Sequence, residues 1–368
     1  MTGSKIPFFG IKRQYANLRD ELIHAADSVW SSGQVLDGPY TEKFERAIAL
    51  RCNRTFAVAV NSCSQGLIFA QMALGLQQTR ILIPTVSFVA TLNSVFMANN
   101  EPRFCDVDDR ALLDFESLDY ALKGTGVGGV MYVNIFGNCL DYDKLRIETN
   151  FFNEDIPIIE DAAQSFGASR DGVPSGKLGD ISVLSFDPTK NLPAYGSGGM
   201  ILTDDAGVYV RLLGLRDNGK PDGFYSTGTN SKMSEAECAQ LLVKLKHFDQ
   251  WQRRRNEIAE FYTQELMEWV DPILPDRATT PAWHKYVIRT SERSRLKEYL
   301  ETQGIETRIH YPTPLYDYPV AQDFVDYATE IFRVGHAHSA EALSLPIYPE
   351  MTDAEVETVV ESIQEYLR

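Results

Sequence analysis

The chain has 368 residues, of which 44% are hydrophobic and 23% are charged, so it is long enough for two domains and a disordered protein is excluded. The formal net charge of −16 at pH 7 argues against nonspecific binding to nucleic acid or to an anionic membrane surface. No apolar run approaches the ~20 residues that span a bilayer, and the first residues lack the apolar stretch of a secretory signal.

Short apolar runs alternate with segments of helical pattern between about residues 55 and 205. The expected strands are Phe56–Val60, Ile81–Ile83, Pro102–Val107, Gly129–Asn134, Ile156–Glu160, Ile181–Phe186 and Gly199–Thr203. Patterns such as Ser64–Leu74 and Phe88–Ala98 between them suit helices. Nearly continuous apolar strands that alternate with helices predict an α/β fold with a mainly parallel sheet, here of seven strands. We assign residues 1–245 to this large domain.

The remaining chain, residues 246–368, predicts a smaller α+β domain. Residues 234–266 lack proline and glycine and predict one or two long helices across the boundary. After a proline-rich loop, Lys285–Thr290 and Ile305–Ile309 predict strands, and Arg293–Thr302 predicts a helix. The last helix, Thr352–Leu367, begins with Thr352 and Glu355 in the spacing of a capping box.

The five cysteines predict neither a disulfide framework nor a zinc site, because they are scattered, odd in number and form no C-x-x-C pair. Reduced thiols fit a soluble, cytoplasmic protein. We expect no metal.

Two charged residues follow neighbouring strands of the expected sheet. In a mainly parallel sheet, ligands bind at the carboxyl ends of the strands. Asp161 follows one apolar run and Lys190 follows another. An enclosed lysine can bond covalently to an aldehyde, and a carboxylate can keep a pyridine nitrogen protonated, so the pair suits pyridoxal 5'-phosphate. Taken singly, each residue is more often a helix cap or a solvated side chain.

Four other features allow weaker interpretations. His310 and Tyr311 suit the sugar side of a pocket, although a histidine at a strand end is often structural. His284 suits packing before a strand. His336 and His338 are expected to face solvent. The arginines 253–255 could approach a nucleotide diphosphate, but a solvated helix face is the preferred interpretation. The chain contains no G-x-G-x-x-G or P-loop motif, which removes the basis for a Rossmann or ATP-binding alternative.

Several motifs together resemble one family. Residues 160–167 read EDAAQSFG, residues 185–192 read SFDPTKNL and are followed by GSGG at 196–199, and residues 229–235 read TNSKMSE. Residues 304–312 (GIETRIHYP) and 343–347 (LSLPI) also match. This set is similar to the DegT/DnrJ/EryC1/StrS sugar aminotransferases over nearly the whole chain.

The resemblance implies the aspartate-aminotransferase fold (fold type I) and a homodimer with active sites shared across the interface. Lys190 would hold the cofactor. Asp161 would face the pyridine nitrogen, Gln164 would lie near the phenolic oxygen, and Phe88 would stack on the ring.

The cofactor phosphate would be held from both subunits. Ser185 would bond it in one subunit, and Asn230 would reach it from the other. Cys63 and Ser64 stand where the family usually has Gly-Thr, at the start of a helix whose N–H groups can hold a phosphate. A small buried packing residue is the preferred interpretation of Cys63 itself.

The implied reaction moves an amino group from L-glutamate to a nucleotide-linked keto-deoxysugar, for glycan, O-antigen (lipopolysaccharide) or antibiotic biosynthesis. The residues around Lys190 slightly favour a 3-keto over a 4-keto sugar, although Asp187, Pro193 and Ser197 depart from the family pattern. Two alternatives remain. A pyridoxamine-phosphate dehydratase would carry histidine in place of Lys190, and a catalytically silent regulatory or scaffold protein would lose residues such as Asp161.

Overall fold

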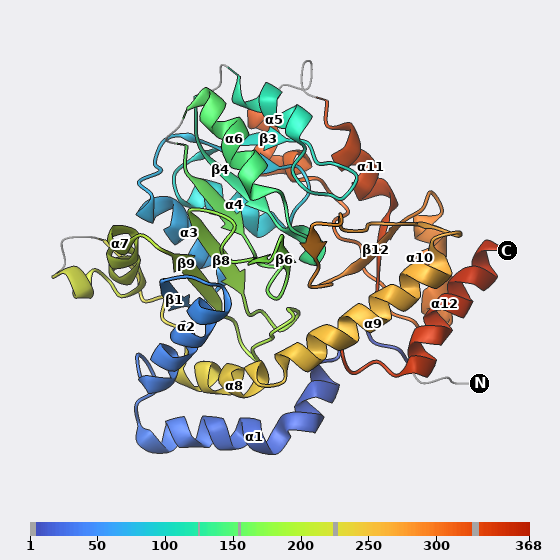
Figure 1. Ribbon diagram of the computed structural model, residues 1–368, viewed down its shortest axis with the longest axis horizontal. Coiled ribbons are helices and arrows are strands. Elements are labelled where there is room, and N and C mark those ends of the chain that lie inside the picture. Colours follow the sequence, from blue (N-terminus) through green and yellow to red (C-terminus); the bar gives the residue numbers. More distant parts are fainter. Residues whose placement is uncertain (1–4, 124–125, 154–155, 224–226, 326–330) are drawn as a thin grey trace.

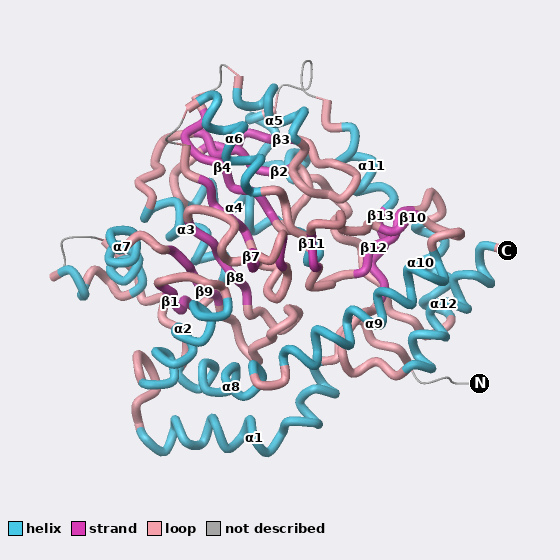
Figure 2. The backbone as a smooth tube through the Cα atoms, viewed as in Figure 1, coloured by secondary structure: helices cyan, strands magenta, loops and turns pink. Residues whose placement is uncertain are grey.

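A seven-stranded sheet forms the centre of the computed structural model, which describes residues 5–123, 126–153, 156–223, 227–325 and 331–368 (Figures 1 and 2). Its strands are β1 (Phe56–Val60), β2 (Arg80–Pro84), β3 (Glu101–Cys105), β4 (Val127–Val133), β5 (Ile158–Asp161), β8 (Ile181–Ser185) and β9 (Gly199–Thr203). The order is β1-β9-β8-β5-β4-β2-β3, and only β9 runs antiparallel to its neighbours. The predicted mainly parallel sheet is confirmed, and each of its seven strands has its counterpart.

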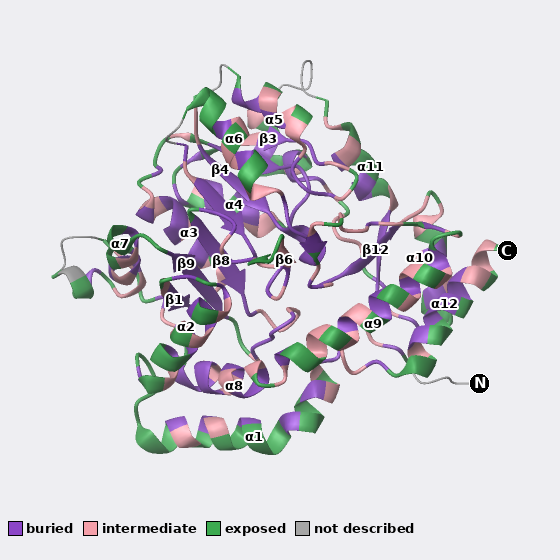
Figure 3. Cartoon of the chain, in the orientation of Figure 1, coloured by how far each residue is buried: buried purple, intermediate pink, exposed green. Residues whose placement is uncertain are grey.

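Helices cover both faces of this sheet. On one face lie α3 (Cys63–Ala73), α4 (Val89–Met97) and α7 (Ala206–Arg216), and on the other lie α2 (Pro39–Arg51), α5 (Phe115–Leu122), α6 (Tyr142–Phe152) and α8 (Glu235–Leu245). Alternate residues of a strand serve the two faces: Val58 packs beneath α3, and Ala57 packs beneath α2. The outermost helix, α1 (Ile11–Ser32), lies along α8 and exposes its other side (Figure 3). The double cover explains why the strands are apolar throughout.

The C-terminal part packs around a second core. Helix α9 (Phe248–Leu266) runs toward it, and β10 (Asp271–Pro272), β12 (Tyr286–Arg289) and β13 (Ala342–Leu345) form a small antiparallel sheet (Figure 1). Helices α10 (Arg293–Thr302) and α12 (Asp353–Leu367) complete this core, and α11 (Arg333–Glu341) leads into β13. The predicted capping box of Thr352 and Glu355 is confirmed. The N-terminal Ile6 joins this core, beside Ile305. The predicted boundary near residue 245 stays a prediction.

Short elements connect these parts. They are the strands β6 (Ser169–Arg170), β7 (Val173–Pro174) and β11 (Thr279–Thr280), and the 3-10 helices η1 (Ile135–Gly137), η2 (Lys220–Asp222), η3 (Leu315–Asp317) and η4 (Pro319–Phe324). β11 pairs with β6 in a separate three-stranded sheet with β7, so the chain after α9 returns to the loop region between β5 and β8 before it enters β12. None of the helices in the described ranges combines the length and the apolar character needed to cross a membrane.

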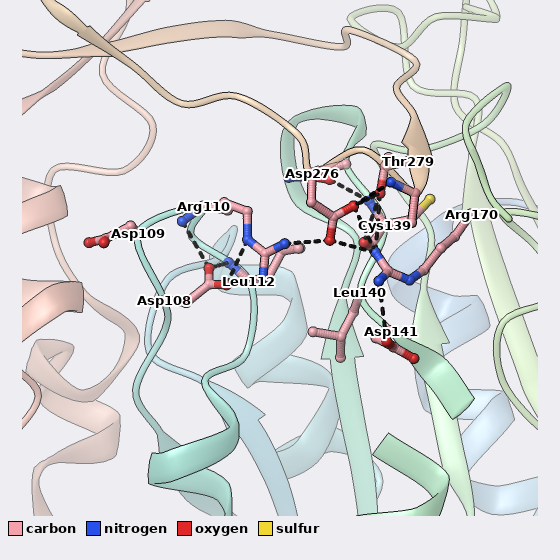
Figure 4. A network of polar contacts seen from close by, with 12 residues as sticks. Asp108, Asp109, Arg110, Leu112, Cys139, Leu140, Asp141, Arg170, Asp276 and Thr279 are labelled. Atoms are coloured by element: carbon pink, nitrogen blue, oxygen red, sulfur yellow. Dashed lines mark hydrogen bonds and ion pairs between the residues drawn. The ribbon is translucent and has the colours of Figure 1, made fainter. Parts of the chain in front are cut away.

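Ion pairs fix the loop between β10 and β11 against the large sheet (Figure 4). The Asp276 carboxylate lies 2.6 Å from the Arg110 guanidinium and 2.8 Å from that of Arg170. Arg170 also contacts Asp141 at 3.2 Å, and the Thr279 hydroxyl donates to Asp276 at 3.1 Å. Because one carboxylate serves two guanidinium groups, the network holds the path of the chain just before β12.

Three expectations for the C-terminal part are wrong. Residues 305–309 form no strand, because this segment makes isolated bridges, from Ile305 to Ile6 and from Arg308 to Ser344. The apolar pattern of the segment instead reflects its packing in the second core. His338 is buried, and its Nε2 lies 2.9 Å from the His310 carbonyl oxygen. Arg255 is also buried. Its guanidinium donates to the backbone oxygens of Trp283 and Ile347, at 3.0 and 2.8 Å.

Candidate active site

The carboxyl ends of β5 and β8 open into one cavity of about 320 Å³. Nine of the ten predicted site residues line it: Cys63, Ser64, Phe88, Asp161, Gln164, Ser185, Lys190, His310 and Tyr311. The first seven come from the strands, helices and loops of the large domain, and the last two come from the C-terminal part. The tenth, Asn230, is exposed and does not line this cavity in its own chain.

Asp161 ends β5 as a buried carboxylate with two hydrogen bonds. Its Oδ2 accepts from the Thr91 hydroxyl at 2.9 Å, and its Oδ1 accepts from the Ala163 N–H at 3.1 Å. Burial raises the pKa of Asp161, and the Thr91 and Ala163 hydrogen bonds oppose that rise. A carboxylate in this position retains unused lone pairs that a cationic ring nitrogen would satisfy.

Gln164 and two aromatic side chains form the wall next to Asp161. The Gln164 side chain accepts from the Phe136 N–H and donates to the Tyr311 hydroxyl, each at 3.0 Å. The Phe88 ring lies 6.0 Å from that of Tyr311 and is 53% exposed. A large aromatic side chain left exposed beside a polar cavity is available to stack on a planar ligand.

Lys190 lies on the loop after β8, opposite Asp161. Its backbone N–H donates to the Asp187 carbonyl at 2.9 Å, and the Asp187 carboxylate accepts from the Thr189 hydroxyl at 2.7 Å, so the loop is a tight turn. Burial lowers the pKa of the Lys190 amine, and electrostatic interactions with Cys63, Asp187 and Asp161 oppose this. A lowered pKa raises the fraction of neutral, nucleophilic amine at neutral pH.

The start of α3 forms an anion-binding cradle. Ser62 caps the helix by accepting from the Gln65 N–H, and among the described residues the N–H groups of Cys63 and Ser64 have no acceptor. A Cβ on Gly199 would come within 2.6 Å of the Cys63 nitrogen, so β9 must have glycine here for α3 to approach. Ser185 ends β8 at the same place. Free N–H groups at a helix N-terminus fit a phosphate.

The sequence assigned no site role to several residues of the cavity. They include Thr91, which donates to Asp161, and three residues that distant segments bring to the cavity. Phe9, His284 and Lys285 line it from the N-terminal segment and from the chain just before β12. The His284 ring lies 3.2 Å from the Asn191 side chain, next to Lys190. Burial is the main reason for the lowered pKa values of His284 and His310, and that of His310 falls to about 2. Both rings are therefore neutral at physiological pH.

A wider depression of about 620 Å³ lies beside β3, away from these residues. Four of its lining residues are aspartates (Asp106, Asp108, Asp109 and Asp114), and none of its described lining residues is a lysine. Within the described ranges, no cluster of three or more histidines, cysteines or carboxylates is arranged to hold a metal. The cavity at β5 and β8 is therefore the candidate active site.

Comparison with known proteins decides the family. The sequence profile of the DegT/DnrJ/EryC1/StrS aminotransferase family matches residues 16–364. The chain belongs to this family. It is 32% identical to a pleiotropic regulatory protein of Geobacillus stearothermophilus over an alignment of 377 positions, which covers 99% of each chain.

Two further matches are to proteins of Streptomyces venezuelae. The chain is 32% identical to a dTDP-3-amino-3,4,6-trideoxy-alpha-D-glucose transaminase of Streptomyces venezuelae, covering 98% of this chain and 96% of the relative. The crystal structure of S. venezuelae DesV in complex with a ketimine intermediate superposes with a TM-score of 0.95 and 29% identity, over 100% of this chain and 99% of that one. The predicted fold and the predicted class, nucleotide-sugar aminotransferases, are confirmed.

Proposed function

We propose that this aminotransferase uses pyridoxal 5'-phosphate to move an amino group from L-glutamate to a nucleotide-linked keto-deoxysugar. The observation that carries the proposal is one cavity in which Lys190 and the buried carboxylate of Asp161 face the same space, beside the free N–H groups at the start of α3. A retained lysine disfavours a dehydratase.

The residues of the cavity divide the binding of the cofactor among them. The start of α3 and Ser185 would hold the phosphate, Asp161 would keep a proton on the ring nitrogen, and Phe88 would cover the ring; all of them line the cavity. The cofactor supplies an aldehyde carbon that receives the amino group and a ring that accepts electrons. Lys190 would hold the cofactor, and its amine would serve as the general base and acid that moves the proton at the donor's Cα.

We place the sugar at the His310 and Tyr311 wall, with the ketone on carbon 3 rather than carbon 4. The similar S. venezuelae transaminase is named for a sugar with nitrogen at carbon 3. The nucleotide supplies binding energy at a distance from the reacting carbon, which helps to orient it. The product would serve glycan, O-antigen or antibiotic biosynthesis in the cytoplasm.

A substrate screen tests this function. The loaded enzyme would be incubated with L-glutamate and dTDP-3-keto- or dTDP-4-keto-6-deoxyglucose, followed by mass spectrometry and NMR of the product. We expect nitrogen at carbon 3. Nitrogen at carbon 4 alone would contradict the position, and no amino-sugar from a wide set of nucleotide keto-sugars would contradict the activity.

We also propose a homodimer in which Asn230 completes the partner's phosphate site. Asn230 lies exposed beside Asp217, outside the cavity of its own chain, as a residue that acts on a second subunit would. Mixing inactive Lys190→Ala chains with Asn230→Ala chains should restore part of the activity, because one site of each mixed dimer has both residues. Full activity of Asn230→Ala alone would remove Asn230 from the phosphate site.

A regulatory role is the second candidate, because one similar relative is named as a pleiotropic regulatory protein. A silent protein has no need of the Lys190, Asp161, Gln164 and Ser185 set, which this chain keeps around one cavity. An absorbance spectrum separates the two candidates, since only a cofactor-loaded protein absorbs in the visible range.

A further inference from the structure

A second lysine lines the cavity, and the proposed cofactor chemistry does not use it. Lys285 stands just before β12, so it enters the cavity from the C-terminal part while Lys190 enters from the large sheet. Only 5% of the surface of Lys285 is exposed. The Asp276 network and β11 fix the chain that leads to it, so its position is set by the fold.

The Lys285 ammonium has aromatic neighbours but no anion. Its Nζ lies 4.5 Å from the ring centre of Phe9 and 5.1 Å from that of Phe8. Within the described chain it has neither an ion pair nor a hydrogen-bond acceptor. Contact with aromatic faces offsets only part of the cost of taking an ammonium out of water.

The other charges around Lys285 do not supply the missing partner. Burial, then the positive charges of Lys190 and Arg255, lower the pKa of Lys285, and Asp187 is the one carboxylate that opposes them. Asp187 is engaged by its own turn, where it accepts from the N–H and hydroxyl of Thr189. An anionic ligand would pair the ammonium and keep it protonated.

We propose that Lys285 binds a carboxylate of a substrate, in the part of the cavity that it lines together with Phe9. The proposal rests on the proposed function, since it needs the cofactor phosphate at the start of α3. The start of α3 and Ser185 would hold that phosphate, Lys190 would hold the cofactor, and His284 and His310 are neutral. Among the described lining residues, Lys285 is therefore the cation available to a second anion. The carboxylate comes from the amino donor or from an acidic sugar, and the two sources are separable.

The test compares Lys285→Met with the wild-type enzyme, both loaded with cofactor. Calorimetry with glutarate, which has the carboxylates of glutamate without its amine, measures binding alone. Rapid mixing with L-glutamate, followed by absorbance, measures the donor half of the reaction, and a nucleotide-linked 3-keto uronate or its uncharged 3-keto counterpart measures the other half. We expect affinity for the carboxylate-bearing compound to fall on the order of 30-fold, with a smaller change in maximal rate.

Two control variants define the outcome. Lys297→Met, on α10 outside the cavity, should change nothing, and Lys285→Arg should recover part of the affinity. Loss confined to glutarate and glutamate assigns the donor, and loss confined to the uronate assigns the sugar. Either result supports the proposal.

Other results overturn the proposal. Unchanged affinities for every carboxylate would do so, and an equal loss for the charged and uncharged sugars would place Lys285 against the nucleotide diphosphate instead. Weakened cofactor binding in Lys285→Met would assign Lys285 to the cofactor. A wild-type protein that binds no cofactor at all would refute the proposed function itself, which is a separate observation.

Discussion

Glu160 and Asp161 are adjacent buried carboxylates at the end of β5, yet their surroundings differ. The Glu160 side chain points away from the cavity, and each of its carboxylate oxygens accepts several hydrogen bonds. Its donors are Asn134, Ser175, Gly176, Leu178 and Ser182, at 2.6–3.1 Å. Asp161 points into the cavity and has only two donors. A saturated carboxylate stabilises the fold, whereas one with spare lone pairs can act on a ligand.

The buried lysines repeat this contrast. Lys244 of α8 donates to the Pro193 carbonyl at 2.5 Å and lies 3.7 Å from the Tyr195 ring centre, so it supports the loop that follows Lys190. Lys190 and Lys285, in the cavity, have no such acceptor among the described residues. The difference in pairing separates structural from functional charges, and the following substitutions test it.

The largest effect is expected for Lys190→Ala. Turnover should fall by at least ~10⁴-fold, because both the covalent attachment and the proton transfer are lost. The phosphate and ring contacts remain, so the variant should still bind pyridoxamine phosphate. Steady-state turnover and a cofactor titration measure the two properties, and residual activity within tenfold of wild type would end the role of Lys190.

Asp161→Asn should reduce turnover on the order of 10²–10³-fold. The amide is close to isosteric but cannot hold a proton on the ring nitrogen. Because Asp161 has few partners in the protein, the free energy of unfolding should hardly change. Turnover and urea denaturation of the cofactor-loaded variant check this, and wild-type turnover would refute the role.

Glu160→Gln should produce the opposite result. The NH₂ of the new amide would face N–H and hydroxyl groups that donate to the carboxylate in the wild type, and it cannot accept their hydrogen bonds. The free energy of unfolding should therefore fall by about 3 kcal/mol. The folded variant should keep turnover close to that of wild type. A loss of turnover without a loss of stability would show that the two sides of β5 are not divided as described.

The smallest effect concerns pH and Lys244. Burial lowers the pKa of Lys244 to about 7, while a lysine of the unfolded chain titrates near 10.4. Above pH 7 only the unfolded chain holds this proton, so this group makes the free energy of unfolding rise with pH, by roughly 1.5 kcal/mol between pH 7 and 8.5. Lys244→Met should lack this rise. Chemical denaturation at the two pH values measures it, and parallel profiles would contradict the expectation.

The sequence predicted the large domain and most of the site because its signals there are local. Strand ends such as Asp161 and Ser185 follow apolar runs directly, and the motif around Lys190 is continuous in the chain. Lys285 and Phe9 escaped assignment because the fold of distant segments brings them to the cavity. His338, Arg255 and the absent strand at 305–309 were mispredicted for a related reason, since their environment depends on tertiary packing that periodicity does not encode.

The central claim is that Lys190, rather than any other lysine, holds the cofactor. Reduction of the loaded protein with borohydride, followed by proteolysis and mass spectrometry, fixes the pyridoxyl group on the residue that carries it. We expect the mass of the pyridoxyl group on Lys190 alone. The same mass on Lys285, or on a lysine outside the cavity, would contradict it.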